Sequence, residues 1–330
     1  MPAAPADPAK RRADDSARPA DDMLFELRQT LILLLTALIW GCTFVAQSMG
    51  MDSVGPFTFT ASRMCLGALF LLPIAWWLRK RLGAYNPAAL ARRQTPLYKK
   101  NLVIGGALCG LCLFAAESFQ QFGLAADVEA GKSGFITSLY IVLVPLLGLF
   151  LGRRSRLVIW VAVAAACVGL WYLCIPAGSH LTLSAGDFYT LCCALVFSLH
   201  ILVISHFIQK VDGVELSMMQ FAVGSATSLA TMLLFESPTW EGWTAALLPI
   251  LWAGIMSNGI AYTLQMVGQR GMNETAASLI LSLEAVVSVL AGWAILGEVL
   301  SSRELLGCVI MAFAVVLAQL PAKKKPAARA

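Results

Sequence analysis

The chain contains ten apolar runs of about 20 residues each, the length that an α-helix needs to cross the hydrocarbon layer of a membrane. Only 13% of the 330 residues are charged, against about 25% in soluble proteins. Because backbone groups in lipid must be satisfied within each segment, such runs predict helices. We therefore expect an all-α membrane protein with ten transmembrane helices, near residues 31–50, 56–78, 101–124, 131–152, 157–175, 185–208, 215–235, 247–268, 274–297 and 304–320.

The basic residues are divided unevenly between the two sides of the predicted membrane. With the N-terminus in the cytoplasm, the cytoplasmic segments hold 21 Lys and Arg residues, and the outer segments hold only Lys132 and Arg303. This asymmetry follows the positive-inside rule. It predicts a multi-pass protein of the inner (plasma) membrane with both termini in the cytoplasm. It also accounts for the net charge of +5 without nucleic acid as a partner.

Polar tails flank the apolar region at both ends. Residues 1–29 begin with a stretch rich in Pro, Ala, Asp and Arg that lacks apolar periodicity, and they predict a disordered cytoplasmic tail. Residues 321–330 predict a basic cytoplasmic tail.

The apolar region divides into two similar parts, residues 30–176 and 184–320, each with five runs. Several positions of the first part recur in the second: Gln120 as Gln265, Gly123 as Gly268, Ser138 as Ser282, Leu139 as Leu283 and Gly148 as Gly292. Because five is an odd number, the second part enters the membrane from the opposite side. We therefore expect two inverted five-helix repeats, an architecture in which carriers place the substrate near the middle of the membrane.

The tripeptide GKS at residues 131–133 resembles the end of a phosphate-binding loop, G-x-x-x-x-G-K-[ST]. The first Gly of that loop is replaced by Ala126, and the charge distribution places Lys132 outside, away from cytoplasmic ATP. The tripeptide therefore predicts a turn into a membrane helix, with Lys132 reaching toward the headgroups. Cys109 and Cys112 form a C-x-x-C without a second pair. We expect neither a cofactor nor a metal ion.

Three stretches resemble the EamA-type family of the drug/metabolite transporter superfamily. They are LTALIWGCTFVAQ, AGKSGFITSLYIVLVPLLGLFLG and ASLILSLEAVVSVLAGWAILGEVLSSRELLGCVIMAFAVVLAQ. The resemblance covers about residues 30–320 and implies ten helices in two inverted halves, a central cavity, and transport of small organic metabolites, often outward. The family usually has Glu after the Leu-Gly that ends these spans. Glu298 follows this pattern, and Arg153 departs from it.

Arg63, Glu117 and Glu284 lie well inside predicted spans, where a charge costs about 2.5–3.5 kcal/mol on insertion scales. Arg63 and Glu117 lie at similar depth in neighbouring spans, which predicts an ion pair. It would serve either as a gate or ligand clamp, or only to fix the register of the helices. Glu284 lies near the middle of span nine, where Tyr140 is its counterpart in span four. Burial favours the protonated form of a carboxyl group. Glu284 is therefore interpreted either as a proton carrier or as the partner in a helix-to-helix hydrogen bond.

Polar residues form rows on single faces of three predicted spans, as the 3.6-residue period of a helix requires. Lipid-facing surfaces do not carry such rows. The polar rows therefore either line a cavity or form hydrogen bonds between helices. The candidate substrate-binding residues are Trp40, Thr43, Gln47, Gln120, Gln121, Tyr140, Asn258, Tyr262 and Gln265. The candidate coupling or gating residues are Glu284, Arg63 and Glu117.

Together these features predict a secondary transporter that exports small organic metabolites by alternating access, with the lipid bilayer and a small-molecule substrate as its partners. Transport is coupled to protons under the interpretation of Glu284 as a proton carrier, and not under its interpretation as a hydrogen-bond partner alone. The alternative is an inverted-repeat channel or facilitator pore. We expect no enzyme, because the sequence lacks G-x-S-x-G, H-E-x-x-H and paired-carboxylate motifs.

Overall fold

The computed structural model describes residues 8–126, 128, 130–153, 155–175, 184–296, 301–318 and 320. Within these ranges the regular structure is helical. The helices are α1 (Pro8–Met51), α2 (Pro56–Tyr85), α3 (Pro87–Gln94), α4 (Pro96–Ala125), α5 (Ala130–Ser138), α6 (Tyr140–Phe150), α7 (Leu157–Cys174), α8 (Ala185–Phe207), α9 (Gly213–Phe235), α10 (Trp240–Ala245), α11 (Leu247–Leu251), η1 (Trp252–Ala261), α12 (Tyr262–Gln269), α13 (Glu274–Leu281), α14 (Glu284–Ala291), η2 (Gly292–Leu296) and α15 (Ser302–Ala318).

Eight segments of the described chain are long and apolar enough to cross a membrane. They are Met23–Met51, Pro56–Leu82, Pro96–Ala125, Ala130–Phe150, Ala185–Phe207, Gly213–Phe235, Leu247–Gln269 and Glu274–Ile295. Two further helices are shorter: α7, with an apolar segment at Leu157–Tyr172, and α15, with 17 residues. The all-α membrane class is thus confirmed, and the count of ten spans stays a prediction.

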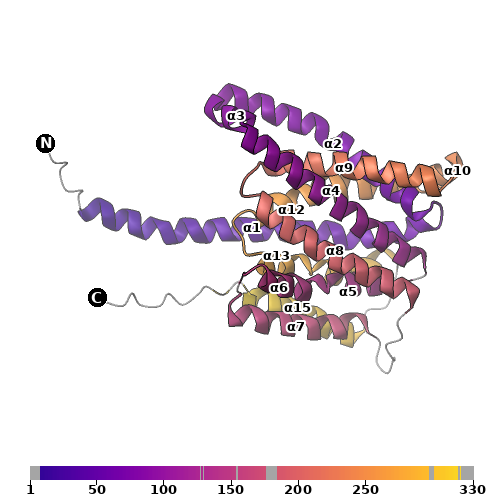
Figure 1. The fold of residues 1–330 in the computed structure, drawn as a ribbon. Helices are drawn as coiled ribbons and strands as arrows, with labels where there is room; N and C mark the ends of the chain where they lie inside the picture. The colour runs from indigo at the N-terminus through magenta and orange to yellow at the C-terminus, as the bar shows by residue number, and fades with distance from the viewer. Residues whose placement is uncertain are drawn as a thin grey trace.

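The long helices lie side by side in one bundle, with their axes roughly parallel in the view of Figure 1. The α1 helix runs between the other helices and projects beyond them at its N-terminal end. It begins at Pro8, so this helix includes part of the segment for which the sequence predicts disorder. Buried residues from most of the spans form one large core, with α4 packed against α8 and α9, and α7 against α15.

Two of the spans are interrupted at corresponding positions. Span four breaks at Leu139, between α5 and α6, and span nine breaks at Ser282 and Leu283, between α13 and α14. At each break the helical bonds tighten to three-residue spacing: Leu139 N–H donates to the Ile136 carbonyl, and Leu283 N–H donates to the Ile280 carbonyl, both at 3.2 Å. Tight turns within a long helix often mark hinges.

Proline does not cause these breaks. Pro145 lies inside α6, six residues beyond the break at Leu139. Span nine breaks without any proline. Span eight is also irregular, because it contains the π-helix η1, and such segments often accompany functional sites.

Charged residues at the ends of the spans join different helices. Lys132, which we expected to reach toward the headgroups, instead pairs with Asp187, with 2.8 Å between Nζ and Oδ2. Asp187 is buried, so this pairing satisfies a carboxylate that would otherwise be isolated. Arg153 pairs with Glu274 at 3.1 Å. Glu298, its counterpart in the family pattern, lies outside the described residues.

Gly110 allows α4 and α9 to approach closely. A Cβ atom added to Gly110 would lie 2.5 Å from the backbone oxygen of Gln220, which cannot move without shifting α9. We therefore expect Gly110→Ala to lower the free energy of unfolding by about 1–3 kcal/mol through overpacking. Gly131→Ala is the matched control, because the nearest atom to its added Cβ lies 4.0 Å away. Thermal unfolding of the purified protein measures both, and equal melting temperatures would contradict this packing.

Candidate functional site

A buried ion pair joins α2 and α4, as the sequence predicts. Arg63 Nε lies 2.8 Å from Glu117 Oε2, and the side chains are 2% and 0% exposed. Arg63 Nη1 also donates to Gln47 Oε1 of α1 at 2.8 Å. Asn258 Nδ2 of η1 donates to Glu117 Oε2 at 3.5 Å. The pair thereby connects four segments of the bundle at one point.

A second buried carboxyl group, that of Glu284, accepts one side-chain hydrogen bond from the described residues. The hydroxyl of Tyr140 donates to Glu284 Oε1 at 3.0 Å, and both side chains are buried. Tyr140 is the first residue of α6 and Glu284 is the first residue of α14, so each directly follows the break in its span. Within the described chain, no basic side chain forms an ion pair with Glu284. The predicted contact between helices is therefore present, and it brings the two counterparts of the repeat together.

Aromatic rings surround this polar centre. The ring centroids of Trp40 and Tyr262 are 4.6 Å apart, and Tyr262 also contacts Phe221 and His200 edge-on, both at 6.0 Å. His200 lies behind Tyr262 and is held by Gln220, with 2.8 Å between Nε2 and Oε1. Because its neighbours pack it on several sides, Tyr262 has a fixed orientation in this wall.

A narrow cavity lies between these groups, and side chains from both parts of the chain enclose it. It is lined by Trp40, Thr43, Phe44, Gln47, Arg63, Gln120, Thr137, Tyr140, Phe197, Ile201, Ser257, Tyr262, Gln265 and Glu284. The volume open to the centre of a water molecule is about 30 Å³, whereas a single water needs roughly 10–15 Å³ by this measure. In this conformation the cavity accommodates a few water molecules and not an organic metabolite.

Most of the predicted site residues lie on this cavity. They are Trp40, Thr43, Gln47, Gln120, Tyr140, Tyr262, Gln265, Arg63 and Glu284. The other three are buried behind it. Glu117 pairs with Arg63, and Asn258 donates to Glu117. The Gln121 amide lies 3.3 Å from the sulfur of Met51. They support the wall or other helices and do not line the cavity.

Five lining residues were not predicted from the sequence, namely Phe44, Thr137, Phe197, Ile201 and Ser257. Most are apolar or small, so they add nothing to a polar row. Their spacing offers a weak signal, because Phe44 lies four residues after Trp40 and Thr137 lies three before Tyr140, on the same helical faces. Phe197 and Ile201 are also four residues apart, on one face of α8. They are the residues that α8 contributes to the described cavity lining, and neither is charged.

Apart from Arg63 Nε, which pairs with Glu117, three polar atoms on the lining residues have no hydrogen-bond partner among the described residues. They are the indole Nε1 of Trp40 and Nη2 of Arg63, both donors, and Oε1 of Gln265, an acceptor. Buried polar atoms normally form hydrogen bonds. The cavity therefore offers two free donors, one free acceptor, the carboxyl group of Glu284 and aromatic walls. Within the described ranges, no group of three or more His, Cys, Asp and Glu side chains could hold a metal ion.

Similarity to known proteins agrees with this architecture. The model of the EamA-like transporter family matches residues 28–175 and again residues 184–320. A protein of Archaeoglobus fulgidus named as an uncharacterized transporter is 30% identical over 293 residues, which cover 87% of this chain and 84% of that protein. The Bacillus subtilis transporter YwfM is 26% identical, covering 90% of this chain and 96% of its own.

Two further comparisons extend the likeness. The Escherichia coli inner membrane transporter YedA is 23% identical, covering 86% of this chain and 88% of its own. A crystal structure with 21% sequence identity aligns with a TM-score of 0.69 over 88% of this chain and 96% of its own, and it supports the fold alone. These names indicate a membrane transporter rather than an enzyme. The chain belongs to the EamA-like transporter family, as the resemblance of its sequence predicted.

Proposed function

We propose that this protein is a secondary transporter that moves small organic metabolites across the inner membrane by alternating access. One observation carries the proposal: a buried cavity at the junction of the two family-matched segments, lined by aromatic rings, amides and a carboxyl group that has no basic partner among the described residues. Carriers built from repeats bind their substrates at such a junction, next to discontinuous helices. The interrupted spans four and nine supply that feature here.

The small volume of the cavity favours a carrier that opens and closes. Binding sites for organic ligands usually enclose about 300–1,000 Å³, far more than the space between these side chains. The helices must therefore separate before a metabolite can enter. The tight turns at Leu139 and Leu283 provide places where the inner parts of two spans can tilt relative to the outer parts.

The orientation that we propose has both termini in the cytoplasm and the two five-helix segments inserted in opposite directions. The excess of Lys and Arg on one side supports it, because basic loops remain in the cytoplasm. We further propose outward transport, which the family resemblance suggests, driven by exchange against protons at Glu284. A carboxyl group in the middle of the membrane that lacks a basic partner can alternate between its charged and neutral forms.

Removing an aromatic wall tests whether the cavity binds the substrate. A comparison of metabolites in cells that lack and that overproduce the protein first identifies the transported compound. We then expect Trp40→Ala to raise the KM for that compound about tenfold or more, because it removes a ring and a free donor from the site. Trp293→Ala is the matched control, since Trp293 is 54% exposed and lies outside the cavity lining. Equal KM values for both variants would reject this cavity as the binding site.

A further inference from the structure

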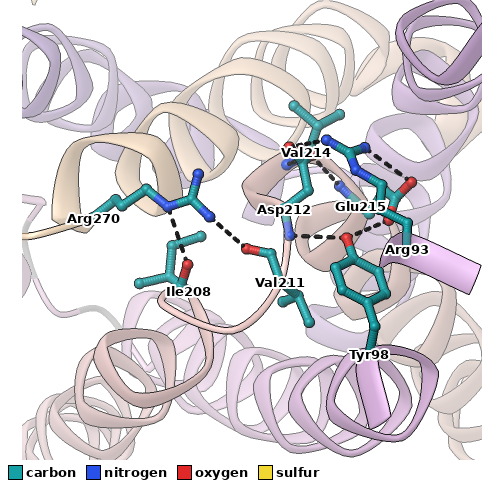
Figure 2. A network of polar contacts seen from close by, with 8 residues as sticks. All are labelled: Arg93, Tyr98, Ile208, Val211, Asp212, Val214, Glu215 and Arg270. Carbon is teal, nitrogen blue, oxygen red and sulfur yellow. Dashed lines mark hydrogen bonds and ion pairs between the residues drawn. The ribbon is translucent and has the colours of Figure 1, made fainter. Parts of the chain in front are cut away.

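An ionic cluster joins the first segment of the chain to the second at one end of the bundle. Arg93 of α3 forms ion pairs with Asp212 Oδ2 at 2.8 Å and with Glu215 Oε1 at 3.2 Å. The hydroxyl of Tyr98, at the start of α4, donates to Glu215 Oε2 at 2.6 Å and accepts from the Asp212 N–H at 3.0 Å. Figure 2 shows these side chains converging on the first turn of α9. We call Arg93, Tyr98, Asp212 and Glu215 the inner tie, because the charge distribution assigns this end to the cytoplasm.

Neighbouring contacts make the inner tie rigid. Asp212 Oδ1 accepts from the N–H groups of Val214 and Glu215, so it also caps α9. Arg270 donates to the carbonyl oxygens of Ile208 and Val211, at 3.2 and 3.0 Å, and holds the loop that leads to Asp212 (Figure 2). The end of α8 and the start of α9 are therefore fixed, and Arg93 and Tyr98 attach α3 and α4 to them.

A second tie joins the two segments at the opposite end. Glu236, at the end of α9, accepts from the Phe57 N–H at 2.9 Å, from the Thr58 N–H at 2.7 Å and from the Thr58 hydroxyl at 2.6 Å. It thereby caps the first turn of α2, where the helix dipole favours a negative charge. Nearby, the Trp243 indole donates to Ser62 Oγ at 3.1 Å. We call Glu236, Phe57 and Thr58 the outer tie.

The two ties occupy equivalent places in the repeat. Helices α2 and α9 are the second spans of the two family-matched segments. In the inner tie, Arg93, between the second and third spans of the first segment, and Tyr98, in the first turn of the third span, hold the N-terminus of α9. In the outer tie, the residue that follows α9, before the third span of the second segment, holds the N-terminus of α2. Figure 1 shows α3 and α10, which flank the inner and the outer tie respectively, at opposite ends of the bundle.

We infer that the two ties are the gates of the transporter, and that each must break for the cavity to open at its own end. This inference rests on the proposed alternating access. Each tie lies at the same end as another ion pair between the segments, Arg153–Glu274 at the inner end and Lys132–Asp187 at the outer end. Breaking one tie therefore weakens its own end and leaves the contacts of the opposite end intact. The two gates differ in chemistry, since the inner tie is ionic and the outer tie is a carboxylate on backbone N–H groups. The residues Arg93, Tyr98 and Glu236 thus act by positioning the helices and do not touch the substrate.

A cysteine in the cavity reports which end is open. Ser257→Cys is introduced into the full chain after its nine native cysteines have been replaced by Ser or Ala. A membrane-impermeant thiol reagent is then added to right-side-out and to inside-out vesicles. The rates of labelling from the two sides give the ratio of outward-open to inward-open protein without requiring a known substrate.

Variants of the two ties should shift this ratio in opposite directions. We expect Arg93→Ala and Tyr98→Phe to increase labelling from the cytoplasmic side about tenfold relative to labelling from outside. We expect Glu236→Ala to produce the reverse shift. Gly55→Ala should act like Glu236→Ala, because the added Cβ would lie 2.5 Å from the Glu236 carboxylate and displace it. Combining Arg93→Ala with Glu236→Ala should return the ratio toward that of the unaltered ties.

The controls neutralise an equivalent charge next to each tie. Arg92→Ala and Glu241→Ala should leave the ratio unchanged, because both side chains are exposed and lie outside the two ties. Shifts in the same direction for both ties, or no shift in a chain that is labelled from both sides, would overturn the gates and leave the proposed function standing. If the chain with intact ties is labelled from one side only or from neither side, alternating access itself fails, and the gates fail with it.

Discussion

Arg63→Met should lower the free energy of unfolding by about 3–5 kcal/mol, because it leaves the buried carboxylate of Glu117 without its ion pair. The Gln47 side chain loses its partner as well. In thermal unfolding of the purified protein at one scan rate, we expect a fall in melting temperature of roughly 10 °C. Arg79→Met, an exposed position on the same helix, should change it little.

A double variant shows whether Arg63→Met destabilises the protein by leaving the Glu117 charge unpaired or by removing the contacts of Arg63. The double variant of Arg63→Met and Glu117→Leu should recover much of the stability, because an apolar pair of similar volume avoids burying an isolated charge. Double-variant stability equal to that of Arg63→Met alone would show that Glu117 is not the group left unbalanced. Transport by a stable double variant then decides between the two interpretations of the pair. Loss of transport indicates a gate or ligand clamp, and retained transport indicates a pair that only fixes helix register.

Glu284→Gln should remove the pH dependence of transport and lower the rate of uphill transport by about 10- to 100-fold. Glutamine keeps the volume and accepts the hydrogen bond from Tyr140, but it cannot take up or release a proton. The expected fall in transport rate is the size of effect that follows from losing one hydrogen bond or ion pair to a charged group at the site. Uptake into vesicles over a range of pH, with the compound identified by the metabolite comparison, provides the measurement.

Glu274→Gln is the matched control for this carboxyl group. Glu274 belongs to the same span but lies at its end, where it pairs with Arg153. Its replacement should leave the pH profile in place. If Glu284→Gln also leaves the pH dependence of transport unchanged, Glu284 is not the proton carrier. Its hydrogen bond with Tyr140 is then the remaining explanation for a carboxyl group at this position.

The sequence predicts the membrane class and much of the cavity because both depend on local patterns. Apolar runs of the right length predict spans, and polar residues at helical spacing predict which faces point inward. Trp40, Thr43 and Gln47 lie on the cavity for this reason. The Arg63–Glu117 pair could be predicted because isolated charges inside the membrane need partners, and only a few charges lie at that depth.

Other features depend on contacts between distant parts of the chain and leave no local pattern. The breaks at Leu139 and Leu283 lack a proline at the break, and they become visible only in the backbone hydrogen bonds. Glu236 follows a helix as an ordinary exposed acid would, yet it caps α2, 178 residues away in sequence at Thr58. Lys132 was expected at the headgroups because the sequence does not reveal that Asp187 lies beside it.

Alternating access requires the cavity to open to one side of the membrane at a time. Counterflow in proteoliposomes distinguishes such a carrier from a pore: vesicles loaded with the unlabelled transported compound are diluted into labelled compound. We expect saturable uptake that is accelerated by the internal compound, because a carrier returns faster when loaded. Uptake that rises linearly with concentration, without counterflow and with ohmic single-channel currents, would contradict the account and identify a pore.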